Sequence, residues 1–358
     1  MKPRLVTLLL AALVVCTAGA GVAPTGASTT ADVLRPASAS ATWAQSQIRL
    51  TEAWSVTSSQ RNGPIVAVLD TGVAPVSDLD GALVPGFDAV GGGETSDENG
   101  HGTAVAAVIA GKHDDAGADG VCPTCRIMPL KIAGADGRAP DTAQAAAINW
   151  AVEHGATLLS ISFVGLEPGG PVADAVSSAV ARGVTVVAAA GNEATYDPRW
   201  PAAYDQVLAV GATDESGGLA GFSNRGAGWV DVVAPGCANS MNQQQQTVLF
   251  CGTSVSTPLA AGSVALLKSL APDTPYAAIV ASLERTAAPV GGDVVQFGRL
   301  DVAAAMRDLG VQPPAPAAAP LVVGGQAPRR ALASRSTSAG KGKSKAASSR
   351  RSARMRVE

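Results

Sequence analysis

The sequence predicts an α/β fold built on a mostly parallel, doubly wound central sheet with helices on both faces. Apolar, β-branched runs alternate along the chain with alanine-rich helical stretches, which is the order that a doubly wound sheet requires. The 358 residues are 47% hydrophobic and only 15% charged, so the chain can build one large core. Its 40 glycines suit tight connections between strands and helices.

The individual elements follow from periodicity and end signals. The run Ile65–Asp70 is apolar and ends on an acid before a Thr-Gly turn, which predicts a buried strand. Asp141 and Gln144 fit a capping box, and Gly183 fits a helix end. Further strands are expected over 126–132, 157–161 and 184–189, with helices over 141–153, 171–182 and 255–270. Acids at the carboxyl ends of such strands line the crevice of an open sheet.

Three residues suggest nucleophilic catalysis. Asp70 ends a buried strand, His101 stands between two glycines before a small apolar helix, and Ser254 lies where a strand turns into a helix. Together they offer an orienting carboxylate, a general base and a nucleophile. A serine at such a turn is by itself more often an N-cap. Every histidine precedes Ser254, which excludes the α/β-hydrolase order, in which the histidine comes last.

Four motifs occur in a fixed order along the chain. They are Asp70-Thr71-Gly72, Gly100-His101-Gly102-Thr103, Ala190-Gly191-Asn192, and Gly252-Thr253-Ser254 with Thr257-Pro258. On these motifs the chain resembles the subtilisin-type serine proteases, the subtilase family, from about Trp43 to about Met306. The resemblance implies a subtilisin-like three-layer fold and a triad of Asp70, His101 and Ser254. It also implies an oxyanion hole made by Asn192 and the Ser254 backbone N–H.

The resemblance also implies residues that bind an extended peptide. The stretch 160–165 resembles the family's edge strand, which pairs with substrate. The expected substrate-binding residues are Ser160, Ser162, Phe163, Val164, Gly165, Gly191, Glu193 and Asn99. Val164 stands where the family usually has glycine, so it narrows the pocket or alters an outer subsite. Asp97, Asn99 and Glu193 favour a basic or polar substrate residue. Trp200-Pro201 resembles the pocket turn, where a cis bond is one option.

Four cysteines remain once the N-terminal segment is set aside, and they fit an oxidising compartment. Four cysteines allow three pairings, and the local pairs Cys122 with Cys125 and Cys237 with Cys251 are favoured. A redox pair or half a zinc site is the alternative for Cys122 and Cys125. Zinc would need further ligands, and the sequence has neither a second Cys-x-x-Cys nor a paired histidine motif.

The chain divides into four segments. Residues 1–20 read as a secretory signal, because Lys2 and Arg4 precede a short apolar run and a small-residue site. A lipoprotein signal at Cys16 is the alternative, although the small residue expected before it is missing. Residues 21–42 are expected to be an unstructured spacer or short propeptide, too short for a foldable prodomain. Residues 43–310 form the catalytic domain, and 311–358 a disordered Pro/Ala-rich, then basic tail.

The net charge of the chain is −3, but the charged residues are distributed unevenly along it. Residues 313–358 hold ten Lys and Arg and one acid, whereas residues 45–312 hold thirteen bases and twenty-seven acids. The acidic body argues against nucleic acid as a partner. No apolar stretch after the signal is long enough to span a membrane. A secreted monomer acting on extended polypeptides is expected, with surface association through the tail as an option beside a merely solvated tail.

The predicted function is a secreted serine endopeptidase that needs no cofactor for its chemistry. A structural calcium ion is an option at Asp78 and Asp114, which fall where the family's amino-terminal calcium site draws ligands; solvated carboxylates are the alternative. Two other functions stay open: a mycosin-like scaffold that accompanies a secretion system, and a cell-surface binding protein acting through its basic tail. A biological effect that survives the Ser254→Ala substitution would favour the scaffold function.

Overall fold

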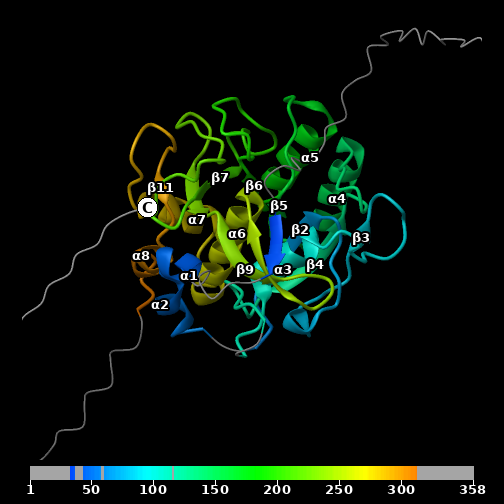
Figure 1. Cartoon of the computed structure of the whole chain (residues 1–358), viewed down its shortest axis with the longest axis horizontal. Coiled ribbons are helices and arrows are strands. Elements are labelled where there is room, and N and C mark those ends of the chain that lie inside the picture. The colour runs from blue at the N-terminus through cyan, green and yellow to red at the C-terminus, as the bar shows by residue number, and fades with distance from the viewer. Residues whose placement is uncertain (1–32, 37–42, 58–59, 115–116, 313–358) are drawn as a thin grey trace, which may run out of the picture. The chain divides into compact units, whose positions relative to one another are not determined.

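A computed structural model describes residues 33–36, 43–57, 60–114 and 117–312 of the chain. Its main sheet has the strand order β11-β8-β7-β6-β5-β2-β4-β3, and each of these pairings is parallel (Figure 1). The strands are β2 (Ile65–Asp70), β3 (Phe87–Asp88), β4 (Arg126–Lys131), β5 (Leu158–Ile161), β6 (Thr185–Ala189), β7 (Leu208–Thr213), β8 (Val232–Pro235) and β11 (Gly298–Arg299). The predicted parallel sheet is therefore confirmed.

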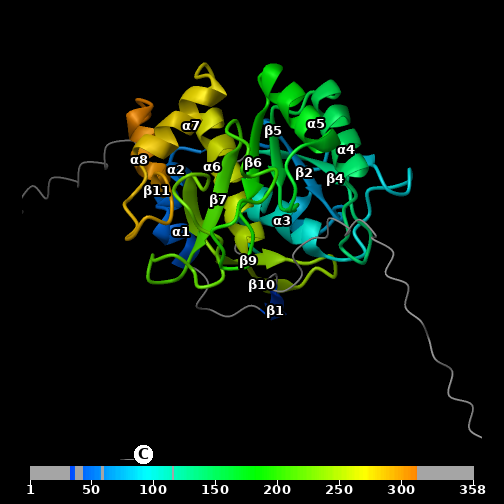
Figure 2. The same ribbon diagram turned by 90° about the horizontal axis from the view of Figure 1, so that it is seen from above.

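Helices cover both faces of this sheet, as Figure 2 shows. Alternate residues of β2 point to opposite faces: Val66 and Val68 pack in one core with α3 and α6, while Ala67 and Leu69 pack in a second core with α4 and α5. The three-layer arrangement is confirmed. The helices are α1 (Trp43–Gln47), α2 (Leu50–Trp54), the 3-10 turn η2 (Ser77–Leu79), α3 (His101–Ala110), α4 (Asp141–Glu153), α5 (Gly170–Ala181), α6 (Thr253–Leu270), α7 (Tyr276–Arg285) and α8 (Val302–Asp308).

Most predicted elements lie within two residues of their expected bounds, but the capping box of α4 does not form. Pro140 is the N-cap residue and has no side chain able to accept a hydrogen bond. The Gln144 amide instead donates to the Ala139 carbonyl at 3.1 Å. Helix α3 also begins at His101 itself, so the histidine belongs to the first turn and not to the loop before it.

A second, antiparallel sheet has the order β1-β10-β9. Its strands are β1 (Val33–Pro36), β9 (Cys237–Met241) and β10 (Thr247–Cys251). The prediction of an unstructured spacer was wrong for residues 33–36, because their backbone pairs with the edge of β10. The signal segment, the rest of the spacer and the basic tail from residue 313 lie outside the described residues, and those assignments stay predictions.

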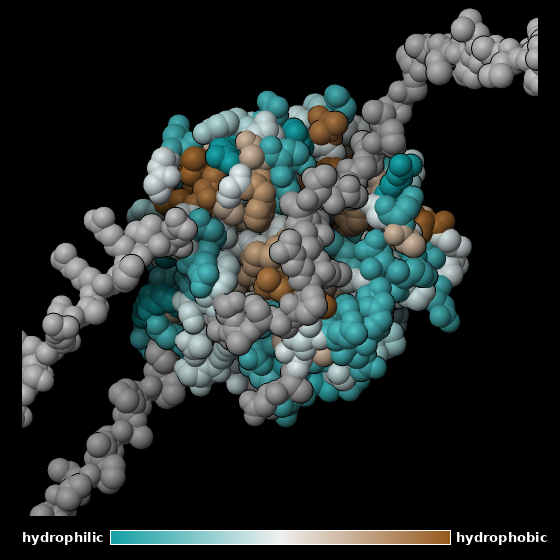
Figure 3. All heavy atoms as spheres, viewed as in Figure 1, coloured by the Kyte–Doolittle hydropathy of each residue, from teal (hydrophilic) through white to brown (hydrophobic). Residues whose placement is uncertain are grey.

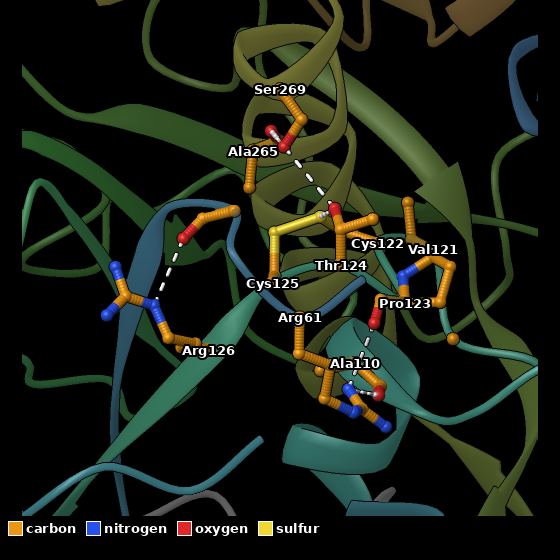
Figure 4. The surroundings of a disulfide bond; sticks show 12 residues. Arg61, Ala110, Val121, Cys122, Pro123, Thr124, Cys125, Arg126, Ala265 and Ser269 are labelled. Atoms are coloured by element: carbon orange, nitrogen blue, oxygen red, sulfur yellow. Dashed lines mark hydrogen bonds between the residues drawn. A yellow bond between two sulfur atoms is a disulfide. The ribbon is translucent and has the colours of Figure 1, made fainter. Parts of the chain in front are cut away.

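Both predicted disulfides are present. Cys122–Cys125 closes a short loop before β4, and Cys237–Cys251 joins residues that face each other across β9 and β10. Figure 4 shows the first, where Arg61 lies beneath the loop. The Arg61 Nη1 donates to the carbonyls of Ala110 at 2.8 Å and Pro123 at 3.0 Å. The guanidinium thus joins the end of α3 to the disulfide loop.

Large hydrophobic side chains on the surface are scattered. Figure 3 shows one face, on which hydrophobic groups lie between hydrophilic ones. The exposed large side chains include Val90, Leu166 and Phe297, which come from three separate loops. Across the described ranges, no helix combines the length and apolar character that a membrane crossing requires.

Candidate active site

Asp70 occupies the carboxyl end of β2, in the middle of the main sheet. Its side chain is fully buried, because β4 and β5 flank β2 and helices cover both faces. One carboxylate oxygen, Oδ1, accepts a hydrogen bond from His101 Nδ1 at 2.7 Å and from the Thr71 backbone N–H at 2.8 Å. The other oxygen, Oδ2, has no hydrogen-bond partner among the described residues. Asp70 therefore fixes the ring orientation and tautomer of His101.

Glycine allows His101 to approach Asp70 this closely. A Cβ atom at Gly102 would lie 2.1 Å from the Gly72 carbonyl and 2.9 Å from the Asp70 Cβ, so only glycine fits between α3 and β2. The His101 side chain is 14% exposed, and its ring meets Phe250 of β10 edge-on at a centroid distance of 5.2 Å. Its Nδ1 faces β2, while one side of the ring faces the small sheet.

A second buried acid, Asp97, holds the loop before His101. It accepts five hydrogen bonds: its Oδ1 from the Thr71 hydroxyl and the backbone N–H groups of Asn99 and Gly100, and its Oδ2 from the backbone and hydroxyl of Thr103. The expectation that Asp97 adds acidity around the cleft stays a prediction, although its side chain is buried. Donors surround its carboxylate, and one of them is the Thr103 backbone N–H in the first turn of α3, whose positive end favours a negative charge.

Ser254 lies in the first turn of α6 and is 1% exposed. The preceding Gly252 has φ 141°, a value that an L side chain rarely adopts, and it makes the turn from β10 into the helix. Helix α6 then packs along the main sheet and against α3. Pro258 has no N–H to donate to the Ser254 carbonyl four residues earlier. The serine therefore stands in a rigid, buried turn beside the helix that begins with His101.

Asn192 is held in one orientation by Thr253, the neighbour of Ser254. The Thr253 backbone N–H donates to Asn192 Oδ1 at 2.8 Å, and the Thr253 hydroxyl donates to the same oxygen at 2.9 Å. The Gly191 N–H in turn donates to the Thr253 hydroxyl at 3.1 Å. Because the amide oxygen faces Thr253, the amide NH2 end points away from it. Thr253, which precedes Ser254 in the chain, thus fixes the orientation of the Asn192 NH2 donor.

Asn224 is a positioning residue that sequence reasoning missed. Its amide oxygen accepts hydrogen bonds from the backbone N–H groups of Glu193 and Thr195, and its NH2 donates to the Ala190 carbonyl at 2.8 Å. One side chain therefore clamps both ends of the loop that carries Asn192. A lone asparagine in a turn more than thirty residues away gives no local signal of this role.

The predicted peptide-binding strand is only partly present. Ser160 lies inside β5 and is paired on both sides, with Val68 of β2 and Val187 of β6, so the edge-strand prediction was wrong for it. The residues from Ser162 onward leave the main sheet. Gly165 pairs with Trp200 through two backbone hydrogen bonds, of 2.6 and 3.1 Å. The cis option at Trp200-Pro201 is confirmed.

The remaining predicted binding residues surround this region without forming one cluster. Phe163 is buried and its ring lies 6.2 Å from that of His101. Asn99 is exposed, and its amide donates to the Ala135 carbonyl at 3.0 Å. Gly191 adopts φ 99° and Val164 is partly exposed.

Arg199 is a second residue that sequence reasoning missed. Its side chain is only 13% exposed, and its Nε lies 3.5 Å from Glu193 Oε2. A Cβ atom placed on Gly191 would lie 3.5 Å from Arg199 Cγ and 2.8 Å from the Glu193 carboxylate. The space next to Gly191, one residue before Asn192, is therefore filled by a long charge pair. The arginine balances the acidity that we expected Glu193 to contribute.

The expectation of calcium at Asp78 and Asp114 stays a prediction. Asp78 is buried and its Oδ2 accepts the Ala118 N–H at 2.9 Å. Burial raises the pKa of Asp78, and the nearby charges of Asp114 and Asp119 add to this rise. Within the ranges that the structure describes, no group of three or more acidic, His or Cys side chains could hold a metal. Calcium takes six to eight oxygen ligands, so a site at these two carboxylates would need backbone or water oxygens as well.

Comparison with known proteins places this geometry in context. The sequence model described as the Subtilase family matches residues 61–338. Subtilisin BL of Lederbergia lenta is 38% identical over 235 residues, which are 64% of this chain and 85% of that protein. Alkaline elastase YaB of Bacillus sp. strain YaB is 37% identical over 241 residues, covering 66% and 62% of the two chains. The thermophilic serine proteinase of Bacillus sp. strain AK1 is 36% identical over 255 residues, covering 70% and 63%.

Proposed function

The chain belongs to the subtilase family and is a subtilisin-like serine endopeptidase, and from this premise we propose that Asp70, His101 and Ser254 form its catalytic triad. Asn192 and the Ser254 backbone N–H then form the oxyanion hole. The observation that carries the proposal is the 2.7 Å hydrogen bond from His101 Nδ1 to a buried carboxylate. It is supported by the two hydrogen bonds from Thr253 that orient the Asn192 amide.

The proposed mechanism follows the development of charge. Ser254 Oγ attacks the scissile carbonyl carbon while His101 removes its proton, and Asp70 stabilises the imidazolium that results. The Asn192 NH2 meets the negative charge on the tetrahedral oxygen. Removal of such a donor costs roughly 2.7–4 kcal/mol, a figure that comes from a subtilisin. His101 then protonates the leaving amine, and water releases the acyl group from the serine.

The proposed substrate is an extended polypeptide outside the cell. Its main chain would lie along Ser162, Phe163 and Val164, which follow the end of β5, in the manner of an added strand. Export rests on the sequence of residues 1–20, with its two basic residues before an apolar run. The two disulfides fit this compartment, because disulfides persist in oxidising surroundings.

Labelling with a fluorophosphonate probe tests the proposal, because the probe reads activation of the nucleophile without a known substrate. The wild type should label and Ser254→Ala should not. Ser256→Ala is the matched control: Ser256 lies two residues further along α6, and its hydroxyl is hydrogen-bonded to the Ala234 and Pro235 carbonyls. Labelling of Ser254→Ala, or a folded wild type that stays unlabelled, would contradict the triad.

A further inference from the structure

The loop that carries Asn192, residues 190–195, has a backbone shape that its sequence does not favour. On either side of Asn192 the backbone is left-handed, with φ 99° at Gly191 and φ 56° at Ala194. Alanine rarely adopts a positive φ, and such a residue persists only where the surrounding structure holds it. The position of the Asn192 side chain therefore depends on contacts from outside the loop.

Asn224 contacts this loop both before and after Asn192. Its backbone N–H donates to the Gly191 carbonyl at 3.0 Å, and its side-chain NH2 donates to the Ala190 carbonyl at 2.8 Å. Its amide oxygen accepts the Glu193 backbone N–H at 3.0 Å. The two residues before Asn192 and the one after it are thus bound to a single residue of a distant segment.

The segment around Asn224 is in turn fixed to the main sheet. Asn224 is fully buried. The hydroxyl of the preceding Ser223 accepts the Ala212 N–H of β7 at 2.9 Å and donates to the Asn224 carbonyl at 2.9 Å. Strand β7 lies beside β6, the strand from which the Asn192 loop leaves. Asn224 therefore relates the backbone of Asn192 to the same sheet that carries Asp70.

We propose that Asn224 sets the position of the oxyanion-hole donor and acts on the transition state through Asn192. This rests on the proposed function, in which Asn192 is that donor. Thr253 orients the Asn192 amide, whereas Asn224 holds the backbone that carries it. A displacement of about 1 Å at a reacting site can cost about 100-fold in rate. Loss of Asn224 therefore lowers kcat and leaves KM nearly unchanged, because the donor meets charge that exists only in the transition state.

A double-mutant cycle tests whether Asn224 acts through Asn192. Kinetics on a chromogenic peptide amide are measured for Asn192→Ala, Asn224→Ala and the double variant, with active enzyme counted by fluorophosphonate titration. Asn224→Ala alone should lower kcat about 10- to 100-fold and change KM by less than about twofold. In the Asn192→Ala background the same substitution should cost less than about threefold. Equal losses in both backgrounds would overturn the proposal.

The Asn192→Ala variant separates this proposal from the proposed function. It should lower kcat about 100- to 1000-fold. A loss below about tenfold would refute Asn192 as the donor, and the role of Asn224 would fall with it. The full loss together with an additive cycle would refute the role of Asn224 alone and leave the oxyanion hole intact.

Asp88→Ala is the matched control for a buried side chain that holds a loop. Its carboxylate accepts three backbone N–H groups of the loop 90–93, beside the edge strand β3. We expect Asp88→Ala to lower the free energy of unfolding as Asn224→Ala does, but to change kcat by less than about twofold. A fall in kcat as large as that of Asn224→Ala would mean that general loosening of the fold causes both losses, and would overturn the proposal.

Asn224→Asp allows the test if Asn224→Ala does not fold. It keeps an acceptor for the Glu193 N–H but turns an oxygen toward the Ala190 carbonyl. Its inhibition constant for a peptide boronic acid, which forms a tetrahedral adduct with Ser254, should rise about tenfold. The constant for the matching peptide amide, which forms no adduct, should change less than about twofold. Equal changes in the two constants would overturn the proposal.

Discussion

Asp97, beside the proposed catalytic residues, is buried, whereas Asp231 and Glu284 are partly buried, and the charges of these acids are compensated differently. Asp97 receives five hydrogen bonds from one loop and one helix start. Asp231 receives one, from the Ala209 N–H, and no hydrogen bond to the Glu284 carboxylate occurs among the described residues. Burial raises the pKa of Asp231 to about 6 and that of Glu284 to about 7. Hydrogen bonds to the charged form of a carboxylate lower its pKa, and Asp231 has only one of them to offset its burial.

Asp70 accepts hydrogen bonds on one carboxylate oxygen, and its replacement should have the largest effect. Asp70→Asn keeps the shape of the side chain but disturbs the tautomer of His101, so kcat should fall about 10⁴-fold. The midpoint of urea unfolding should change less than for the Asp97 variant below, because Asp70 Oδ2 has no partner to lose. Steady-state kinetics on a peptide substrate measures the first effect. A loss of less than tenfold would mean that Asp70 does not orient the histidine.

Asp97→Asn should act on stability first. An amide can replace only one of the two carboxylate oxygens as an acceptor, which leaves buried donors of Thr103 or the loop unpaired. We expect a loss of about 3 kcal/mol in the free energy of unfolding, measured by urea titration in the Ser254→Ala background to prevent self-digestion. Asp136→Asn, at an exposed loop position, is the control and should stay within about 0.5 kcal/mol. Equal losses of unfolding free energy in Asp97→Asn and Asp136→Asn would mean that the hydrogen bonds to Asp97 do not stabilise the fold.

Glu193 adds a third case, an acid balanced by Arg199. We expect a short side chain on the acyl side of the cut, because the pair fills the space beside Gly191. Arg199→Gly should raise the ratio of kcat/KM for a large apolar over a small side chain about tenfold, as read from a peptide library. Arg199→Met keeps the volume without the charge and should keep the short preference. A strong preference of the wild type for basic residues would contradict this expectation and would support the basic or polar preference expected from the sequence.

The uncompensated acids should make stability depend on pH. In the folded protein Asp231 and Glu284 hold protons that the unfolded chain releases near pH 4, because their folded pKa values are raised to about 6 and about 7. The folded state therefore binds more protons, and stability falls as pH rises from about 4 to 7. We expect a fall of about 1 kcal/mol once exposure to solvent is discounted. Thermal unfolding of Ser254→Ala should show it, and Asp231→Asn with Glu284→Gln should flatten the curve.

Calcium would be a fourth way to compensate an acid, and its effect should be the smallest. Binding at Asp78 predicts that calcium raises the unfolding temperature of Ser254→Ala by a few degrees, by mass action on the folded state. Asp78→Asn in the same background should remove this increase, and a chelator should reverse it. An unfolding temperature that is insensitive to calcium would leave the Asp78 carboxylate with the Ala118 N–H as its donor, while Arg61 binds the Asp78 backbone carbonyl.

The sequence predicted what local pattern controls. Strand β2, helix α6 and both disulfides follow from apolar runs, end signals and short spacings. The clamp by Asn224 and the donors around Asp97 could not be predicted, because they join segments that only the fold brings together. Ser160 failed for the same reason: whether a strand lies at an edge depends on its neighbours. Strand β1 lies in a stretch of sequence with few large apolar residues, so the sequence did not indicate a strand there. Within the described residues its strand partner is β10, which is distant in the chain.

The edge of β10 can hold one strand at a time. Strand β1 is connected to α1 by only residues 37–42, and such a short connection gives an effective concentration in the millimolar range. Strand β1 would then compete with any other chain that pairs with this edge of β10, and dilution would not relieve the competition. Short substrates that do not reach the edge of β10 would not be subject to this competition. The activity measured with protein substrates would therefore be inhibited more strongly than the activity measured with short reporter peptides.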